Sequence, residues 1–472
     1  MSADTGGLDV AGGSHGLAVS LDEMAWAARR LDRVVDRLQR LLAELLLLEV
    51  HPRLQAASLV APDRGLPLQL GLARLCSPVG VGGSALALEV LADGVAEALA
   101  VYDDVERLVD GAIDTVEVGV GIGLGATAPL TVPALGLGVA VAGPERVDAW
   151  LFDHPWVVPH TMDGLEGVVL GLGLGVPVAG PWLLGRSLGA GGYPPRSQPE
   201  AVEALLLGLA GTGVMDESGH RASVVPGARQ PGRGPRSVAD LVARDGPSAG
   251  GEKVRVTRVA RPDGTSAWIV DVPGTQTFDP RTGRTIYDMT SNAALAANQR
   301  TLSTQAIADA LGDAQARMGG PGARHEPILL NGHSQGGLTA AALAADPRVR
   351  RRFPGARHVV TTGAPVATVP VGRDVSVLSV EHDQDLVPGL DGADNPDREQ
   401  WVTVRRDVAE DLGEDAGATE AHDNDLYERT AAQIDDAGDQ DPSLRDWRAG
   451  AAPFLDGGEA ETIDYEITRE RR

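Results

Sequence analysis

The chain has 472 residues, about three times the length of a typical domain, so we expect more than one folding unit. Hydrophobic residues make up 43% of the chain, which is enough to bury a core and excludes an intrinsically disordered protein. The formal net charge of -25 would repel a phosphate backbone, and we therefore expect no nucleic-acid partner.

Cysteine usage excludes two further classes of protein. Cys76 is the single cysteine, so it forms no disulfide within the chain. No Cys or His residues stand at the spacing of zinc ligands. We expect neither a metal nor an organic cofactor.

Residues 1–185 are predicted to form a mostly α-helical N-terminal domain. Apolar residues recur at three- and four-residue spacing over residues 20–52 and again over residues 84–109, as in amphipathic helices. Two long helices joined by a short segment are expected to pack as a hairpin or as part of a bundle. The chain does not open with a basic start and an apolar run, so we expect a cytoplasmic protein or one exported without a cleavable signal peptide.

Two glycine-rich stretches in this region, residues 118–144 and 167–185, contain no charged residue. Each is long enough to cross a bilayer of about 30 Å, so one interpretation is membrane contact through residues 118–185. The other is a packed glycine-rich hairpin in a water-soluble domain. Glycine costs a helix roughly 1 kcal/mol at each position and Pro129 and Pro133 interrupt further, which favours the second interpretation.

Residues 186–235 are rich in Gly, Pro, Ser and Arg and are predicted to be a linker. Residues 236–472, which end in an acidic part, show a different sequence pattern. Strand-like segments alternate with helical patterns; they lie at residues 253–260, 267–272, 328–331, 358–362, 375–380 and 401–404. This alternation predicts an α/β domain with a mainly parallel sheet.

The strongest local signal is Gly-His-Ser-Gln-Gly-Gly at residues 332–337. An apolar strand precedes it and an alanine-rich helix follows, which is the setting of a nucleophile elbow. Gly332 and Gly336 allow the sharp turn that raises the hydroxyl of Ser334 above the sheet. Ser334 is therefore the candidate nucleophile.

A serine nucleophile needs an imidazole base, and three histidines follow Ser334. His358 lies at the mouth of a predicted strand, where a role in capping or in the core is favoured. His422 stands in a loop late in the chain, which suits the order nucleophile, acid, base of these folds, and it is the favoured base. His382 is the alternative.

The acid that orients the base is expected just beyond the strand at residues 375–380. Glu381, Asp383 and Asp385 all lie there, at the sheet edge that presents the serine. Position alone barely separates Asp383 from Asp385.

These motifs resemble the lipase-like α/β-hydrolases, especially the class 3 or fungal-type lipase group. The resemblance rests on residues 332–337, Asp385-Leu-Val-Pro388 and the later histidine. It covers residues 236 to about 437. It implies an α/β-hydrolase fold in which Ser334 is the nucleophile, Asp385 the triad acid and His422 the base.

The resemblance also implies an oxyanion hole. Those lipases carry Arg-Gly-Ser or Arg-Gly-Thr after an early strand, whereas this chain has Pro273-Gly274-Thr275, so proline replaces the arginine. Thr275 and Gln335, the residue after the nucleophile, are then the oxyanion donors. The polar loop at residues 274–291, with Phe278 and Tyr287, is a candidate lid; the alternative is a surface loop with no gating role.

The helical N-terminal region lies outside this resemblance. Its long helices look similar to the helical-hairpin leaders of type VII secretion substrates, but the chain has no Trp-x-Gly turn and Trp26 lies within the first helix. A helical partner or a second copy of the chain, bound through this region, is the other interpretation.

Two functions follow from the sequence. The first is a serine hydrolase that cleaves carboxylic esters, with small-molecule esters or lipids as substrates. The second is a catalytically silent secreted or membrane-associated interaction protein on a hydrolase scaffold. The complete set of Ser, Asp and His in the expected order favours the enzyme.

Overall fold

The computed structural model describes residues 7–77, 143–175, 195–245, 253–261, 263–413, 416–438 and 440–472, with scattered residues between 80 and 122. The chain divides into two compact units. The larger joins Met1–Gly16 to Ile113–Arg472, and the smaller is Leu17–Ala112. The smaller unit is therefore inserted into the larger one along the chain.

The larger unit is built on a 9-stranded mixed sheet in the order β1-β8-β7-β6-β5-β4-β3-β9-β2 among the described residues. Its strands are β1 (Leu8–Gly12), β2 (His220–Arg233), β3 (Val254–Ala260), β4 (Ser266–Val272), β5 (Ile328–His333), β6 (Ala356–Thr362), β7 (Ser376–His382), β8 (Trp401–Arg406) and β9 (Glu459–Arg471). Neighbouring strands from β4 to β8 are parallel, and the outer pairs on both sides are antiparallel. The predicted α/β class with a mainly parallel core is confirmed.

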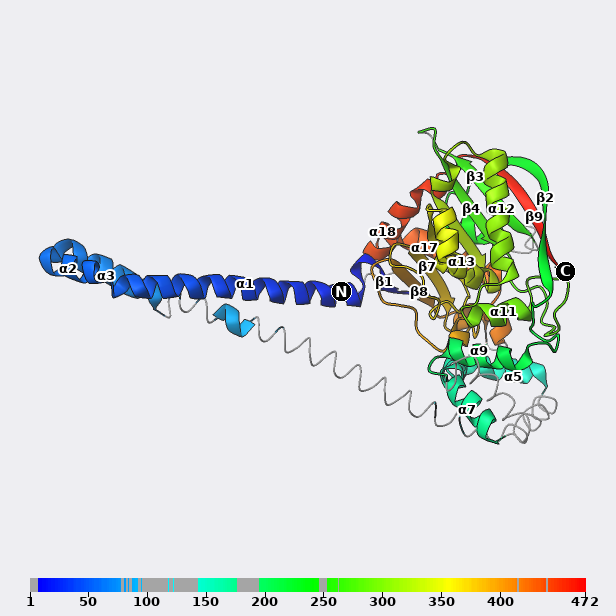
Figure 1. The fold of residues 1–472 in the computed structure, drawn as a ribbon, viewed down its shortest axis with the longest axis horizontal. Helices are drawn as coiled ribbons and strands as arrows, with labels where there is room; N and C mark the ends of the chain where they lie inside the picture. The colour runs from blue at the N-terminus through cyan, green and yellow to red at the C-terminus, as the bar shows by residue number, and fades with distance from the viewer. Residues whose placement is uncertain are drawn as a thin grey trace. The chain divides into compact units, whose positions relative to one another are not determined.

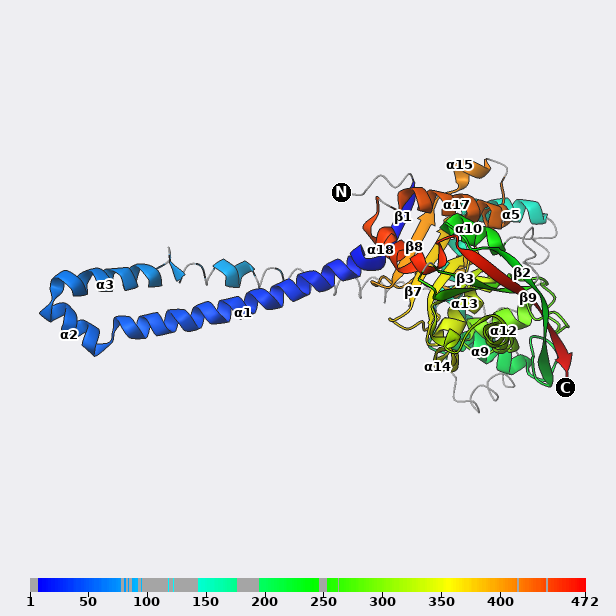
Figure 2. The same cartoon turned by 90° about the horizontal axis from the view of Figure 1, so that it is seen from above.

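Helices cover both faces of this sheet, which explains why most residues of the central strands β4 to β7 are buried. On one face α12 (Leu302–Met318) and α13 (Gln335–Ala345) bury an alanine-rich surface against β3 to β6. On the other face α10 (Val238–Val242), α17 (Asn424–Ala437) and α18 (Pro442–Ala451) pack over β4 to β8. Figure 2 shows α12 and α13 on one side of the strands and α10 and α17 on the other.

Shorter helices complete the described part of the larger unit. They are α5 (Pro144–Asp153), α6 (Val157–Asp163), α7 (Leu165–Gly175), α9 (Gln198–Leu209), α11 (Met289–Ala296), α14 (Pro347–Arg352), α15 (Ala409–Leu412) and α16 (Ala418–Ala421). Val169 of α7 is buried against Ala201 and Ala204 of α9. Figure 1 shows α5, α7 and α9 gathered at one end of the sheet, below α11.

The structure corrects the predicted domain boundaries. The expected linker at residues 186–235 contains α9 and β2, and β2 pairs with β9 along its length. Strand β1, inside the expected helical domain, pairs with β8. Strand β2 was not predicted because it contains prolines. Pro226 and Pro231 are tolerated because β2 is the edge strand of the described sheet, with β9 as its one neighbour there.

The smaller unit is helical, as predicted. Helix α1 (Leu17–Glu49) covers most of the first expected helix, and Pro52 opens α2 (Pro52–Val60). Helix α3 (Pro62–Cys76) packs against α1, where Val35 and Leu72 are buried. The second predicted helix, residues 84–109, lies mostly outside the described residues.

The uncharged stretches at residues 118–144 and 167–185 also lie largely outside the described residues. Of the first, residues 118, 122, 143 and 144 are described, and of the second, residues 167–175 in α7. Within the described part of the chain, no helix combines the length and the apolar character needed to cross a bilayer.

Candidate active site

Ser334 occupies the sharp turn between β5 and α13. Its backbone φ of 56° and ψ of -127° form a combination that residues other than glycine rarely adopt. A Cβ on Gly336 would overlap the carbonyl of Val272, so only glycine fits there. The backbone amide of Ser334 donates to the carbonyl oxygen of Thr362 in β6 at 2.9 Å, which anchors the turn. The strand, turn and helix predicted around Ser334 are all present.

Asp385 and His422 meet at the same edge of the sheet. Oδ2 of Asp385 lies 2.7 Å from Nδ1 of His422. The Asp385 side chain is fully buried, and its Oδ1 accepts the backbone amide of Val387 at 2.9 Å. His422, in the turn after α16, keeps 23% of its side chain exposed. A buried carboxylate therefore faces one nitrogen of a partly accessible imidazole.

A residue at the end of β5 contacts His422 and precedes the turn at Ser334. The ring of His333, the residue before Ser334, has its centroid 4.6 Å from that of His422. Burial and the neighbouring His422 lower the pKa of His333 to about 3, so this imidazole is neutral at pH 7. Gly363, with φ of 56°, leaves the room that both partners need, since a Cβ there would lie 2.8 Å from Asp385 Oδ2 and 3.0 Å from His422 Nδ1.

The two other histidines are used in packing. His382 is buried, with Nδ1 2.8 Å from the carbonyl oxygen of Ala421 and Nε2 2.8 Å from Oγ1 of Thr430. Burial lowers its pKa to about 4. His358 lies in β6 and meets the ring of Phe454 edge-on at 5.0 Å. With both ring nitrogens engaged, His382 is poorly placed to act as a base.

The alternative acids point elsewhere. Glu381 accepts hydrogen bonds from Asn395 and Arg405, and Asp383 is exposed. Of the three carboxylates at the end of β7 and just beyond it, Asp385 is the one that contacts His422.

The predicted oxyanion loop lies against Ser334 and the end of β5. A Cβ on Gly274 would lie 3.6 Å from Cβ of Ser334 and 3.3 Å from the carbonyl oxygen of His333. Oγ1 of Thr275 accepts a hydrogen bond of 3.0 Å from Nδ2 of Asn292, which leaves the threonine O–H free to donate. Gln335 opens α13, where backbone amides lack partners within the helix.

The loop proposed as a lid has two different halves. Phe278 is exposed, whereas Tyr287 is fully buried and its backbone carbonyl accepts the amide of Gln276 at 2.9 Å. Tyr287 is therefore part of the core rather than of a cover over the site.

Sequence reasoning missed Tyr427, on α17. Its hydroxyl donates to Oδ2 of Asp385 at 2.7 Å, and its ring stacks on that of His382 with centroids 3.8 Å apart. Burial and the Asp385 carboxylate raise its pKa. Its place five residues after His422 carries no pattern by which the sequence could have marked it, whereas His333 was visible within Gly-His-Ser.

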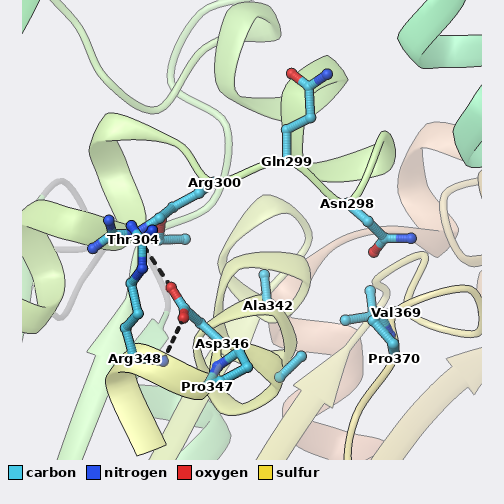
Figure 3. A pocket seen from close by; sticks show the side chains of 11 residues that line it. Asn298, Gln299, Arg300, Thr304, Ala342, Asp346, Pro347, Arg348, Val369 and Pro370 are labelled. Carbon is cyan, nitrogen blue, oxygen red and sulfur yellow. Dashed lines mark hydrogen bonds and ion pairs between the residues drawn. The ribbon is translucent and has the colours of Figure 1, made fainter. Parts of the chain in front are cut away.

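Two cavities lie away from these residues. One of about 360 Å³ is lined by residues that include Asn298, Arg300 and Asp346, with Arg300 3.2 Å from Asp346 (Figure 3). A neighbouring cavity of about 270 Å³ also includes Arg300. Neither is lined by Ser334, Asp385 or His422. In the described part of the chain, no three His, Cys, Asp or Glu side chains are grouped so as to hold a metal ion.

Comparison of the chain with protein-family models, with curated proteins and with solved structures found no match.

Proposed function

We propose that the chain is a serine hydrolase that cleaves carboxylic esters, lipid esters among them. The observation that carries the proposal is the pair of His422 and buried Asp385, whose Nδ1 and Oδ2 lie 2.7 Å apart. The His422 ring lies 4.6 Å, centroid to centroid, from that of His333, the residue before Ser334, and Ser334 itself stands on a strained turn. Strained backbone at a nucleophile is typical of sites where the side chain must be presented to a substrate.

In this proposal, the contact with Asp385 fixes the tautomer of the neutral His422 ring. The Asp385 carboxylate accepts the hydrogen on Nδ1, so Nε2 is the nitrogen without a hydrogen and can accept the proton of a serine hydroxyl. When His422 becomes protonated, the nearby negative charge of Asp385 stabilises the imidazolium.

In the proposed reaction, Oγ of Ser334 attacks the ester carbonyl carbon while Nε2 of His422 takes its proton. The negative oxygen that forms is stabilised by the backbone amides of Thr275 and Gln335, with the Thr275 hydroxyl as a further donor. The intermediate collapses, His422 gives the proton to the leaving alcohol, and Ser334 keeps the acyl group. Water activated by His422 then attacks the acyl-enzyme and releases the acid.

The test compares the purified chain with Ser334→Ala and His422→Ala on short p-nitrophenyl esters. We expect both variants to lose at least about 10³-fold in kcat, because the triad residues act as a unit. A fluorophosphonate probe should label the wild-type chain and not Ser334→Ala. Circular dichroism spectra matching those of the wild type show that the variants are folded.

The alternative, a silent interaction protein on a hydrolase scaffold, makes the opposite prediction. A folded wild-type chain with no labelled serine and no esterase activity would support it and reject the enzyme. A panel of acyl chain lengths, from short esters to emulsified lipids, then defines the substrate class of an active chain.

A further inference from the structure

Helices α5, α6 and α9 contact the two loops that carry Asp385 and His422. Residues 388–391, just after Asp385, form the 3-10 helix η5 (Pro388–Asp391), which packs on α6. A Cβ on Gly389 would lie 3.0 Å from Cδ of Pro159, and Nε2 of Gln198 donates to the carbonyl oxygen of Leu390 at 3.3 Å. Helix α5 packs on α16, just before His422.

The contact between α5 and the His422 loop is a specific one. Oδ1 of Asp148 accepts two hydrogen bonds from Thr419, from its backbone amide at 3.2 Å and from its hydroxyl at 2.9 Å. The carbonyl oxygen of Thr419 in turn accepts the backbone amide of His422 at 3.3 Å. Asp148 is thus one residue removed from the backbone of the proposed base.

Apolar packing supports the same contact. Phe152, one helical turn after Asp148, is 8% exposed and packs in a cluster with Ala418, Ala421 and Leu426. These residues flank His422 on both sides. The loop is therefore held by α5 through both a polar and an apolar contact.

Gly417 shows how closely the Asp148 side chain packs against the backbone before His422. A Cβ at this position would overlap Oδ2 of Asp148, yet the backbone φ of -112° is one that any residue can adopt. The requirement for glycine at 417 thus comes from the Asp148 carboxylate and not from backbone strain.

We propose that Asp148 is a positioning residue, which acts through Thr419 to hold His422 in line with Ser334. The inference rests on the proposed hydrolase function. It assigns to residues 144–163, which lie outside the resemblance to lipases, the task of fixing the geometry of the triad loops.

The experiment uses the full chain and five variants. Asp148→Ala removes the acceptor and should lower kcat by about tenfold with KM changed less than about twofold, because a small misplacement of a base is costly while the substrate contacts remain. Asp148→Asn keeps an acceptor oxygen at the same place and should restore most of kcat. Gly417→Ala should mimic Asp148→Ala by displacing the carboxylate.

The double variant Gly417→Ala with Asp148→Ala gives a sharper expectation. Since removal of the carboxylate makes room for the new methyl group, the second change should add little to the first, so the two effects on kcat are not additive. Asp441→Ala is the matched control: Asp441 caps α18 by accepting the amide of Leu444, so its removal should lower Tm. It should leave kcat unchanged.

The outcomes separate this inference from the proposed function. If the wild-type chain shows no activity that depends on Ser334, the hydrolase proposal fails and the positioning role fails with it. If the wild-type chain is active and Asp148→Ala equals it in kcat, or if Asp441→Ala loses as much, only the positioning role is overturned. Additive losses in the double variant would also overturn it.

Discussion

Tyr427 donates its hydroxyl hydrogen to Oδ2 of Asp385, the same carboxylate oxygen that lies 2.7 Å from Nδ1 of His422. One oxygen thus accepts two donors, while the other accepts the amide of Val387. A buried carboxylate with all its partners in place is held in a single orientation. The phenol therefore helps to aim the carboxylate at the imidazole.

Replacing Tyr427 with Phe removes this donor and keeps the ring on His382. We expect kcat/KM for a p-nitrophenyl ester to fall about tenfold, since a hydrogen bond to a charged group contributes about 1.5–3 kcal/mol. Thermal melting should show a lower Tm than the wild type. Esterase activity equal to that of the wild type would contradict the orienting role.

Tyr287 provides the matched comparison. It too is fully buried, but its hydroxyl has no hydrogen-bond partner within the described structure, and burial raises its pKa. An unsatisfied buried hydroxyl costs about 1–3 kcal/mol, so Tyr287→Phe should keep or raise Tm. Urea unfolding compares the free energy of unfolding of this variant with that of the wild type. A loss of stability as large as that of Tyr427→Phe would show that the hydroxyl has a partner.

The strained turn at Ser334 predicts a conflict between stability and activity. At φ of 56° a serine or alanine costs of order 1–3 kcal/mol, whereas glycine adopts this conformation freely. Glycine also gains entropy in the unfolded chain, which offsets about 0.4–1 kcal/mol. Both variants at Ser334 lose the hydroxyl, and we expect Ser334→Gly to unfold at higher urea concentration than Ser334→Ala. The reverse order would show that the turn is unstrained.

The half-buried His358 makes stability depend on pH. Burial lowers its pKa to about 4, below the value of about 6.5 expected in the unfolded chain. Between these values the unfolded chain binds more protons than the folded one, so the free energy of unfolding falls as the pH falls from about 6.5 toward 4. His358→Leu should reduce the drop in Tm between pH 7.5 and pH 5. An equal drop in the variant and the wild type would rule out this contribution.

The turn at Ser334 could be predicted from sequence because its signal is local: a strand, Gly-x-Ser-x-Gly and a helix are contiguous. The contact of His422 with Asp385 could be anticipated only in part, since chain order favoured His422 whereas position alone did not separate Asp385 from Asp383. Tyr427 and Asp148 were not accessible. Their contacts depend on how α17 and α5 are folded back onto the sheet edge, which no spacing along the chain records.

Two of the outer strands could not be predicted from sequence either. Strand β1 consists of five residues, and its register pairs Leu8 with Arg406, far along the chain. Strand β2 contains prolines and glycines that are typical of loops. Strand β9 was within reach of sequence reasoning, because Ile463, Tyr465 and Ile467 alternate with polar residues and all three are buried.

The position of β9 between β3 and β2 makes residues 459–471 a bridge on which both neighbours depend. Deleting these residues would remove the hydrogen-bond partners of two strands at once, detach β2 from the sheet and expose the backbone edge of β3. Truncated chains should therefore aggregate.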